Sequence, residues 1–398
     1  MKIYMNFTLC DSYSVRSWKN AMSEDYYEKL REDPLYVNRA DRAKANKAPS
    51  KSSSMGTMAG VRFPNATNRK DLIAGIMDQD KDLVPGAFGN LFYKPVTING
   101  VDLKLEPVQP SIGTIVHGID LSQDLKSQSM VTFLRELWLE RRVLVFRNQN
   151  HLSRQEMVEF AGYFGEVGKP FGEAEHVPNS PYDLNQQVKD PEIPNMLILP
   201  SDENVPNVAS SWHCDATWQK RPPMASMLMC REAPPIGGDT CFCDCYAMWE
   251  GLSLQTKKRV EHLTAVHLGT IGHQMDGVTP EAVHPVARTH PETGKTVLYV
   301  QQGFVRHFAE EHQVPEDEEK RLFLEMKLQE GRPEYTCRVK WEPGSLAMWD
   351  NRAVLHCASG DFWPHRRLME RLTILDFEES RRTPYYQPVV VQAPPSTN

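Results

Sequence analysis

The chain has 398 residues and a formal net charge of −7, and 40% of its residues are hydrophobic while 24% are charged. This composition is that of a globular protein, so it excludes full disorder, collagen and coiled coil. The length allows one large domain with an appendage, or two domains. The mild excess of acidic residues argues against binding nucleic acid through bulk charge, and no apolar stretch is long enough for a transmembrane helix.

The start of the chain and its cysteines indicate an intracellular, cytoplasmic protein. Residues 1–11 are interrupted by polar residues too early to form the hydrophobic region of a secretory signal. Eight cysteines in so long a chain do not suggest a disulfide framework. Three of them, Cys241, Cys243 and Cys245, alternate along an expected strand, and three ligands in one straight strand cannot surround a tetrahedral metal. Packed thiols are therefore expected.

Three parts are predicted along the chain: an N-terminal extension at 1–98, a main domain at 99–385 and a short tail at 386–398. The extension contains a linker-like run at 39–54, which has five Lys or Arg residues and almost no large apolar residue. Its role is open, because such a segment can cover a site, mediate a homo-oligomer or do neither.

The main domain begins with helices and a strand. Apolar residues at helical spacing between 130 and 138 predict an amphipathic helix, and the apolar run 143–146 predicts a buried strand. Ser153 followed by Glu156 is a capping-box pattern that predicts the start of a second helix. Beyond residue 200, short strand-like runs separated by Pro and Gly turns favour a β-sandwich or barrel, with helical inserts near 251–266 and 309–330.

The residues with the clearest chemistry are His213 and Asp215. On a strand, residues two positions apart point to one face, so the imidazole and the carboxylate would converge. Alone, this pair is weak evidence, because a surface His near an Asp often arises by chance. His356, far downstream, offers a third ligand. Two His and one carboxylate on one face leave the open positions that a non-haem Fe(II) oxygenase needs for a cosubstrate and O₂.

Two arginines follow the third ligand. Arg367 could bind the distal carboxylate of an iron-chelating 2-oxo acid through two parallel hydrogen bonds, which Lys cannot make as well. Arg367 and Arg371 would share one face of a strand, because residues alternate between the two faces. Arg371 would then bind an anionic substrate, or it would form a structural salt bridge in the barrel mouth.

With these residues in place, the chain resembles the taurine dioxygenase (TauD/TfdA) family of Fe(II)/2-oxoglutarate-dependent oxygenases. The resemblance covers about residues 103–378. It lies in the runs SIGTIVHGIDLS (111–122), VLVFRNQ (143–149), FGEVGKP (164–170), WHCDATW (212–218), GGDT (237–240), HPVARTHPETGK (284–295), WDNRAVLH (349–356) and RRLMERLT (366–373). It implies a mainly β fold with flanking helices, a double-stranded β-helix or jelly roll of the cupin-like type.

The resemblance also implies site roles and a reaction. By it, His213, Asp215 and His356 would bind Fe(II). Thr240 and Arg367 would hold the distal carboxylate of 2-oxoglutarate, and Arg371 matches the position that binds the sulfonate in the taurine enzyme. The implied reaction couples decarboxylation of 2-oxoglutarate, giving succinate and CO₂, to oxidation of a substrate C–H bond by O₂.

The substrate is where the chain departs from the taurine enzyme. No His follows the FGE run, where Lys169 stands near a predicted substrate loop, and Ala209 and Ser210 occupy positions where the taurine enzyme has an Asn. These departures argue against taurine. Arg371 and Lys169 are instead expected to bind a small anionic substrate, a carboxylate or amino-acid derivative. The alternatives are oxidative cyclisation or desaturation of a natural-product precursor, sulfonate desulfonation, and a non-catalytic jelly-roll binding protein. A halogenase of this fold is disfavoured, because such enzymes replace the carboxylate ligand, which here is Asp215.

Overall fold

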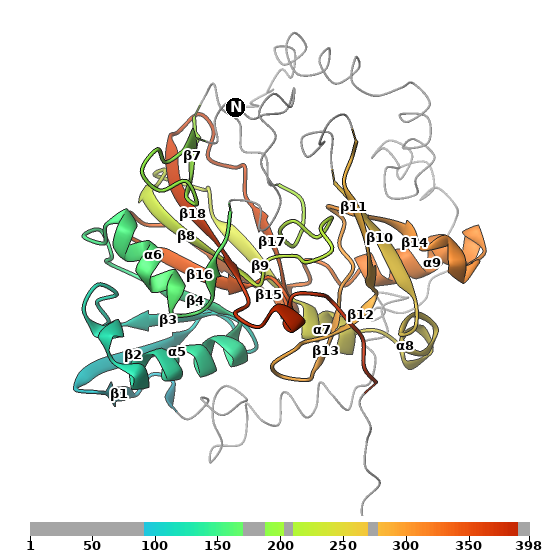
Figure 1. Cartoon of the computed structure of the whole chain (residues 1–398), viewed down its shortest axis with the longest axis horizontal. Helices are drawn as coiled ribbons and strands as arrows, with labels where there is room; N and C mark the ends of the chain where they lie inside the picture. The colour runs from blue at the N-terminus through green and yellow to red at the C-terminus, as the bar shows by residue number, and fades with distance from the viewer. Residues whose placement is uncertain (1–90, 170–187, 203–209, 270–277, 389–398) are drawn as a thin grey trace, which may run out of the picture. The chain divides into compact units, whose positions relative to one another are not determined.

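The computed structural model describes residues 91–169, 188–202, 210–269 and 278–388, all within one compact unit of the chain. The predicted extension and tail therefore lie outside the described residues except for 91–98 and 386–388, and their roles stay predictions. No helix in the described ranges is long and apolar enough to cross a membrane. Figure 1 shows how the described elements are arranged and labels most of the helices and strands.

The largest sheet has ten strands and forms one wall of the fold. Its order is β1-β2-β3-β4-β16-β8-β18-β7-β6, with β5 paired to β18. The strands are β1 (Pro95–Ile98), β2 (Val101–Pro107), β3 (Thr114–His117), β4 (Val143–Phe146), β5 (Glu166–Val167), β6 (Val188–Lys189), β7 (Leu197–Ser201), β8 (Ala225–Glu232), β16 (Leu346–Asp350) and β18 (Arg367–Leu375). The sheet thus begins within the range predicted as extension, because β1 pairs with β2.

A smaller sheet faces the large one and completes the jelly roll. It has the order β15-β9-β17, formed by β15 (Thr336–Val339), β9 (Thr240–Asp244) and β17 (Val354–Ala358). The two sheets meet over one apolar core, to which Val145, Trp349 and Met369 contribute from the large sheet and Phe242 and Val339 from the small one. This mainly β double-stranded β-helix is the predicted fold.

Two helices cover the other face of the large sheet, as predicted from their spacing and caps. They are α5 (Gln128–Arg141) and α6 (Arg154–Gly162), and the 3₁₀ turn η3 (Asp124–Lys126) precedes α5. Ser153 and Glu156 form the predicted capping box at the start of α6. On α5, Leu134 and Trp138 are fully buried against the sheet. Each such burial stabilises the fold by about 1.5–3 kcal/mol.

The remaining elements pack on the outer face of the small sheet. They comprise the sheet β11-β10-β14, the hairpin β12–β13 and several helices. Their bounds are α7 (Cys245–Glu250), α8 (Leu254–Val260), β10 (Thr264–Leu268), β11 (Glu281–Pro285), β12 (Ala287–Thr289), β13 (Thr296–Leu298), β14 (Val305–Phe308), η5 (Glu310–His312), α9 (Glu316–Lys327) and η6 (Pro333–Tyr335). The last element, η7 (Glu379–Arg381), follows β18, and the next residue, Arg382, pairs with Glu166 of β5 at 2.7 Å.

The helical inserts are shorter than predicted. The insert expected near 251–266 ends with α8, because residues from Thr264 onward pair with β11 and β14 as β10. The insert near 309–330 consists of η5 and α9. Cys241 and Cys243 lie on β9, but Cys245 begins α7, so the three cysteines do not share one strand. The seven described cysteines are free, and burial raises the pKa of Cys243 to about 12, so these are packed thiols as expected.

A buried ion-pair network fixes the connection from β16 to β17. Arg352 is 1% exposed, and its guanidinium lies 2.8 Å from Asp350, 2.7 Å from Glu292 and 3.1 Å from Asp376. Asp350 also lies 3.0 Å from Nε2 of His290. The WDNRAVLH and HPVARTHPETGK runs thus meet in space, and this contact anchors the turn that leads into His356.

Candidate metal centre

His213 and His356 are held side by side by their backbones. His213 N–H donates to the His356 carbonyl at 3.0 Å, and His356 N–H donates to the His213 carbonyl at 2.8 Å. His356 lies within β17, whereas His213 makes only this isolated bridge. The prediction that His213 and Asp215 lie on a regular strand is therefore wrong. Asp215 begins a turn in which Ala216 has φ +49°, and this turn brings the carboxylate round to the histidines.

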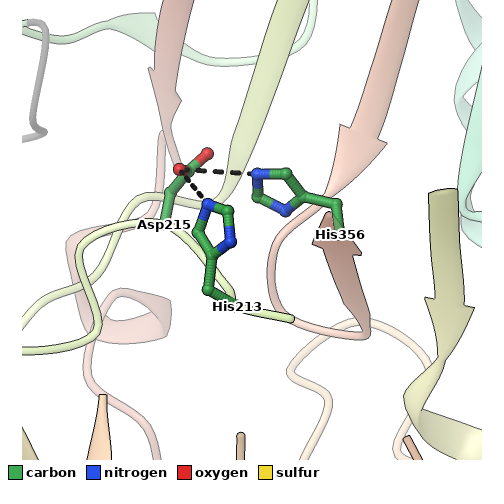
Figure 2. Close-up of side chains that lie close together, drawn as sticks. All are labelled: His213, Asp215 and His356. Atoms are coloured by element: carbon green, nitrogen blue, oxygen red, sulfur yellow. Dashed lines mark ion pairs between the residues drawn. The ribbon is translucent and has the colours of Figure 1, made fainter. Parts of the chain in front are cut away.

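The three side chains nevertheless converge as predicted (Figure 2). Asp215 Oδ1 lies 3.6 Å from His356 Nε2 and 3.9 Å from His213 Nε2. All three ligand atoms lie within 4.8 Å of one another, and all three residues are buried. Metal–nitrogen and metal–oxygen bonds of about 2.0–2.2 Å can bridge this spacing. Among the described residues, this is the one group of three or more His, Cys, Asp or Glu side chains with such a geometry.

The protonation states suit a divalent metal. Burial lowers the pKa of both His213 and His356, so both imidazoles are neutral near pH 7. Nδ1 of His213 lies 2.7 Å from the Ser211 carbonyl, so that nitrogen carries the proton and Nε2 keeps its lone pair. Burial alone would raise the pKa of Asp215, but the charged guanidinium of Arg371 holds it below its usual value. Two neutral imidazoles and one carboxylate are the donor set of non-haem Fe(II) sites.

The second oxygen of Asp215 is occupied by protein groups. Arg371 Nη2 lies 2.8 Å from Oδ2, and Ser226 Oγ donates to the same oxygen at 2.6 Å. Asn351 Nδ2 in turn donates to Ser226 Oγ at 3.0 Å. Only Oδ1 faces the histidines. Sequence reasoning missed Ser226, which carries no motif signal on the apolar β8, and Asn351, which the WDNRAVLH run did contain.

Arg367 lies in a buried position with an unused donor. It is 5% exposed, and its Nε has no hydrogen-bond partner among the described residues. Its guanidinium lies 5.6 Å from the ring centre of Phe362, and burial lowers the pKa of Arg367 to about 10, so it stays charged near pH 7. Trp341 Nε1 donates to Thr240 Oγ1 at 3.0 Å. A buried cation and a hydroxyl of this kind fit a carboxylate ligand.

The predicted alternation along β18 is confirmed. Met369 lies in the core between the two sheets, whereas Leu372 packs with the helices on the other face. Glu370 also faces those helices, where Arg154 and Arg231 each donate to it at 2.7 Å. Arg367 and Arg371 share the parity of Met369 and therefore lie on the inner face.

Lys169 is exposed, two residues after β5. It is the last described residue before 170–187, so its predicted contact with substrate stays a prediction. Ala209 lies outside the described residues.

Comparison with known proteins decides the family. The family model for the taurine catabolism dioxygenase TauD, TfdA family matches residues 104–373. The chain belongs to this family. The chain is therefore an Fe(II)- and 2-oxoglutarate-dependent dioxygenase that uses O₂, and the non-catalytic alternative is not supported.

Individual relatives support the same assignment. An alkylsulfatase of Acinetobacter baylyi is 31% identical over 68% of this chain and 84% of its own length. An alpha-ketoglutarate-dependent sulfonate dioxygenase of Saccharomyces cerevisiae is 30% identical over 70% of this chain and 67% of its own length. The crystal structure of a taurine dioxygenase from Burkholderia xenovorans matches with a TM-score of 0.57 and 31% identity, covering 69% of this chain and 91% of that chain.

Proposed function

We propose that this TauD-family dioxygenase oxidises a C–H bond of a small organic anion that Arg371 binds beside the metal. The observation that carries the proposal is the position of Arg371, which contacts the metal-site carboxylate Asp215 and lies on the same strand face as Arg367. Arg371 Nε is buried without a hydrogen-bond partner among the described residues, so the guanidinium has a donor to spare.

In this proposal His213, Asp215 and His356 hold Fe(II). The bound metal supplies activation of O₂, coupled to decarboxylation of 2-oxoglutarate to succinate and CO₂. The protein keeps the two imidazoles neutral and aims their lone pairs at one point. It also restrains Asp215 to a single free oxygen, which leaves positions for the cosubstrates.

Arg367 and Thr240 anchor 2-oxoglutarate in the same proposal. Arg367 offers donors in a fixed fork, and Thr240 adds a hydroxyl donor, because its oxygen already accepts from Trp341. A tryptophan N–H can only donate, so the hydrogen of the Thr240 hydroxyl is free to point at an anion. These two residues would fix the cosubstrate relative to the metal and limit its rotation.

The carbon part of the substrate would lie against an apolar cluster next to His213. Phe304 meets the His213 ring edge-on at 5.9 Å between centroids, and Trp218 packs on Phe304 at 4.6 Å. With Ala216 they form a separate small apolar group. An anion with an apolar body thus suits both sides of the site. The names of the relatives add a sulfonate or sulfate ester to the carboxylate that the sequence favoured, since some relatives are named for sulfonates or sulfate esters and others for phenoxyacetate.

The reaction outcome follows from where the C–H bond lies. Hydroxylation at the carbon that carries the sulfonate or the sulfate ester oxygen gives an unstable product. This product decomposes to a carbonyl compound and sulfite or sulfate. A carboxylate substrate would instead give a hydroxylated, desaturated or cyclised product. Desaturation and cyclisation stay predictions. A place in natural-product biosynthesis and a contact of Lys169 with the substrate also stay predictions.

A binding screen with matched ligands tests the proposal. The anaerobic Fe(II)·2-oxoglutarate complex should show a visible charge-transfer band that alkyl sulfonates or sulfate esters shift, whereas the alcohols of the same chain length do not. Aerobic reactions should then release sulfite or sulfate together with stoichiometric succinate. His213→Ala and Asp215→Ala should abolish succinate formation. A band that responds equally to the alcohols would show that Arg371 does not select anions.

A further inference from the structure

The turn that carries two of the metal-site residues is held in an unfavourable conformation. We call residues 213–219 the metal turn. Within it, Ala216 has φ +49°, in the left-handed region that side chains with a Cβ atom avoid. Such a conformation persists only where the surroundings determine it, and it clusters at functional sites.

Gln301 spans the metal turn with both ends of its amide. It lies between β13 and β14, and it is 1% exposed. Its Oε1 accepts from the backbone N–H of Cys214, the residue between His213 and Asp215. Its Nε2 donates to Thr217 Oγ1 at 2.6 Å. A single buried side chain thus forms hydrogen bonds to the chain on both sides of Asp215.

His284 on β11 holds the far end of the same turn. Its Nε2 lies 2.9 Å from the carbonyl of Thr217 and 2.9 Å from that of Gln219. Both partners are acceptors, so Nε2 carries the proton. Burial lowers the pKa of His284 to about 4, which keeps the ring neutral near pH 7.

The backbone next to Gln301 also lies against the metal turn. Gly303 N–H donates to the Trp212 carbonyl at 3.0 Å. A Cβ atom at Gly303 would come within 2.9 Å of His213 Cβ, so the approach requires glycine. Segment 301–303 therefore contacts the metal turn at His213 and on both sides of Asp215.

We propose that Gln301, supported by His284, is a positioning residue that holds the metal turn so that His213 and Asp215 can bind Fe(II) together. This inference rests on the proposed function. Without the Gln301 amide, the Cys214 N–H and the Thr217 hydroxyl lose their partner, and the turn can relax away from the left-handed conformation. The imidazole and the carboxylate then no longer meet at one point. The affinity for Fe(II) should therefore fall, because residues that orient the ligands also determine how tightly the metal binds.

The test measures Fe(II) binding directly. Gln301→Met keeps the volume and removes both hydrogen bonds, and it should weaken Fe(II) binding by about 10- to 100-fold in anaerobic calorimetry. The lost hydrogen bonds should lower the melting temperature of the metal-free protein by a few degrees without unfolding it. Thr217→Val removes the hydrogen bond that the Thr217 hydroxyl accepts from Gln301 Nε2 and should weaken Fe(II) binding by about tenfold. Thr217→Ser keeps the hydroxyl and should restore the wild-type affinity.

The outcomes separate this inference from the proposed function. Unchanged Fe(II) affinity in Gln301→Met overturns the inference, as does an equal loss in Thr217→Val and Thr217→Ser. If Gln301→Met does not fold, the Thr217 pair decides alone. If wild-type protein does not bind Fe(II), or if His213→Ala binds it as well as wild type does, the proposed metal site itself is wrong.

Discussion

Arg367→Lys should raise the KM for 2-oxoglutarate far more than its conserved charge suggests. Arg367 is 5% exposed and has an unused Nε, so a carboxylate ligand would receive parallel hydrogen bonds from a fixed fork. A lysine ammonium is a point charge that also loses the stacking on Phe362, which lies 5.6 Å from the guanidinium. Burial already lowers the pKa of Arg367 to about 10, and it would disfavour a charged lysine as well.

The expected magnitude follows from the lost charged hydrogen bonds. These are worth about 1.5–3 kcal/mol, which corresponds to roughly 10- to 150-fold in the KM for 2-oxoglutarate. Succinate formation at saturating Fe(II) and substrate measures this KM, and titration of the anaerobic charge-transfer band measures the binding step alone. The kcat at saturating 2-oxoglutarate should fall much less than kcat/KM.

A neighbouring arginine supplies the control. Arg366 lies one residue away, has a 60% exposed side chain and pairs with Glu232 at 2.7 Å. Arg366→Lys should therefore leave the KM for 2-oxoglutarate unchanged. If Arg367→Lys also leaves it unchanged, another group anchors the cosubstrate, and the assignment of Arg367 is refuted.

Three further changes have defined expectations. Trp341→Phe removes the donor to Thr240 and should raise the KM for 2-oxoglutarate by roughly 2- to 10-fold, measured by succinate formation. Arg352→Met leaves buried carboxylates without their counter-ion and should lower the free energy of unfolding by about 3–5 kcal/mol in urea titrations. Stability should fall as the pH drops from about 6.5 towards 4, because burial lowers the pKa of His284 and His290 to about 4 while the unfolded chain protonates both near 6.5.

Each of these changes has a control or a contrary outcome. Trp363 is 70% exposed, so Trp363→Phe should leave the KM unchanged. Lys320 pairs with Glu316 on the surface, and Lys320→Met should lower the free energy of unfolding by less than about 1 kcal/mol. For the pH dependence, the unfolded state binds more protons between pH 6.5 and 4, so an equal free energy of unfolding at pH 7 and pH 5 would contradict the assignment of buried neutral histidines.

Regular elements with strong patterns could be predicted from the sequence. The helical spacing of α5, the apolar run of β4 and the capping box at Ser153 each reflect one local rule, and the tertiary structure agrees with all three. The alternation of side chains along β18 was also predictable. The pairing with β8 shifts register between Leu368 and Met369, but successive residues of β18 still alternate between its two faces. These features depend on residues close in sequence, which is why local reasoning suffices.

The irregular parts of the site could not be predicted. His213 belongs to no strand and makes a single bridge to His356 of β17. The left-handed conformation of Ala216 has no sequence signature. The helical insert predicted near 251–266 extends beyond the end of α8, because the sequence around Thr264 does not reveal that this segment pairs with β11 and β14. Gln301 carries no local sequence signal, since its contacts join residues far apart in the chain. Each of these features depends on tertiary contacts.

In the proposed function, the two oxygens of Asp215 would link the metal to the substrate. Oδ1 faces the histidines, while Oδ2 accepts from Ser226 and contacts Arg371. Arg371 therefore balances the charge of a metal-site residue and, in the proposed function, also receives the substrate anion. An anion that draws the guanidinium away from Oδ2 leaves more negative charge on the carboxylate and strengthens its hold on a cation. Binding of the substrate anion should then raise the affinity for the metal. By linkage, the bound metal should raise the affinity for the anion by the same factor.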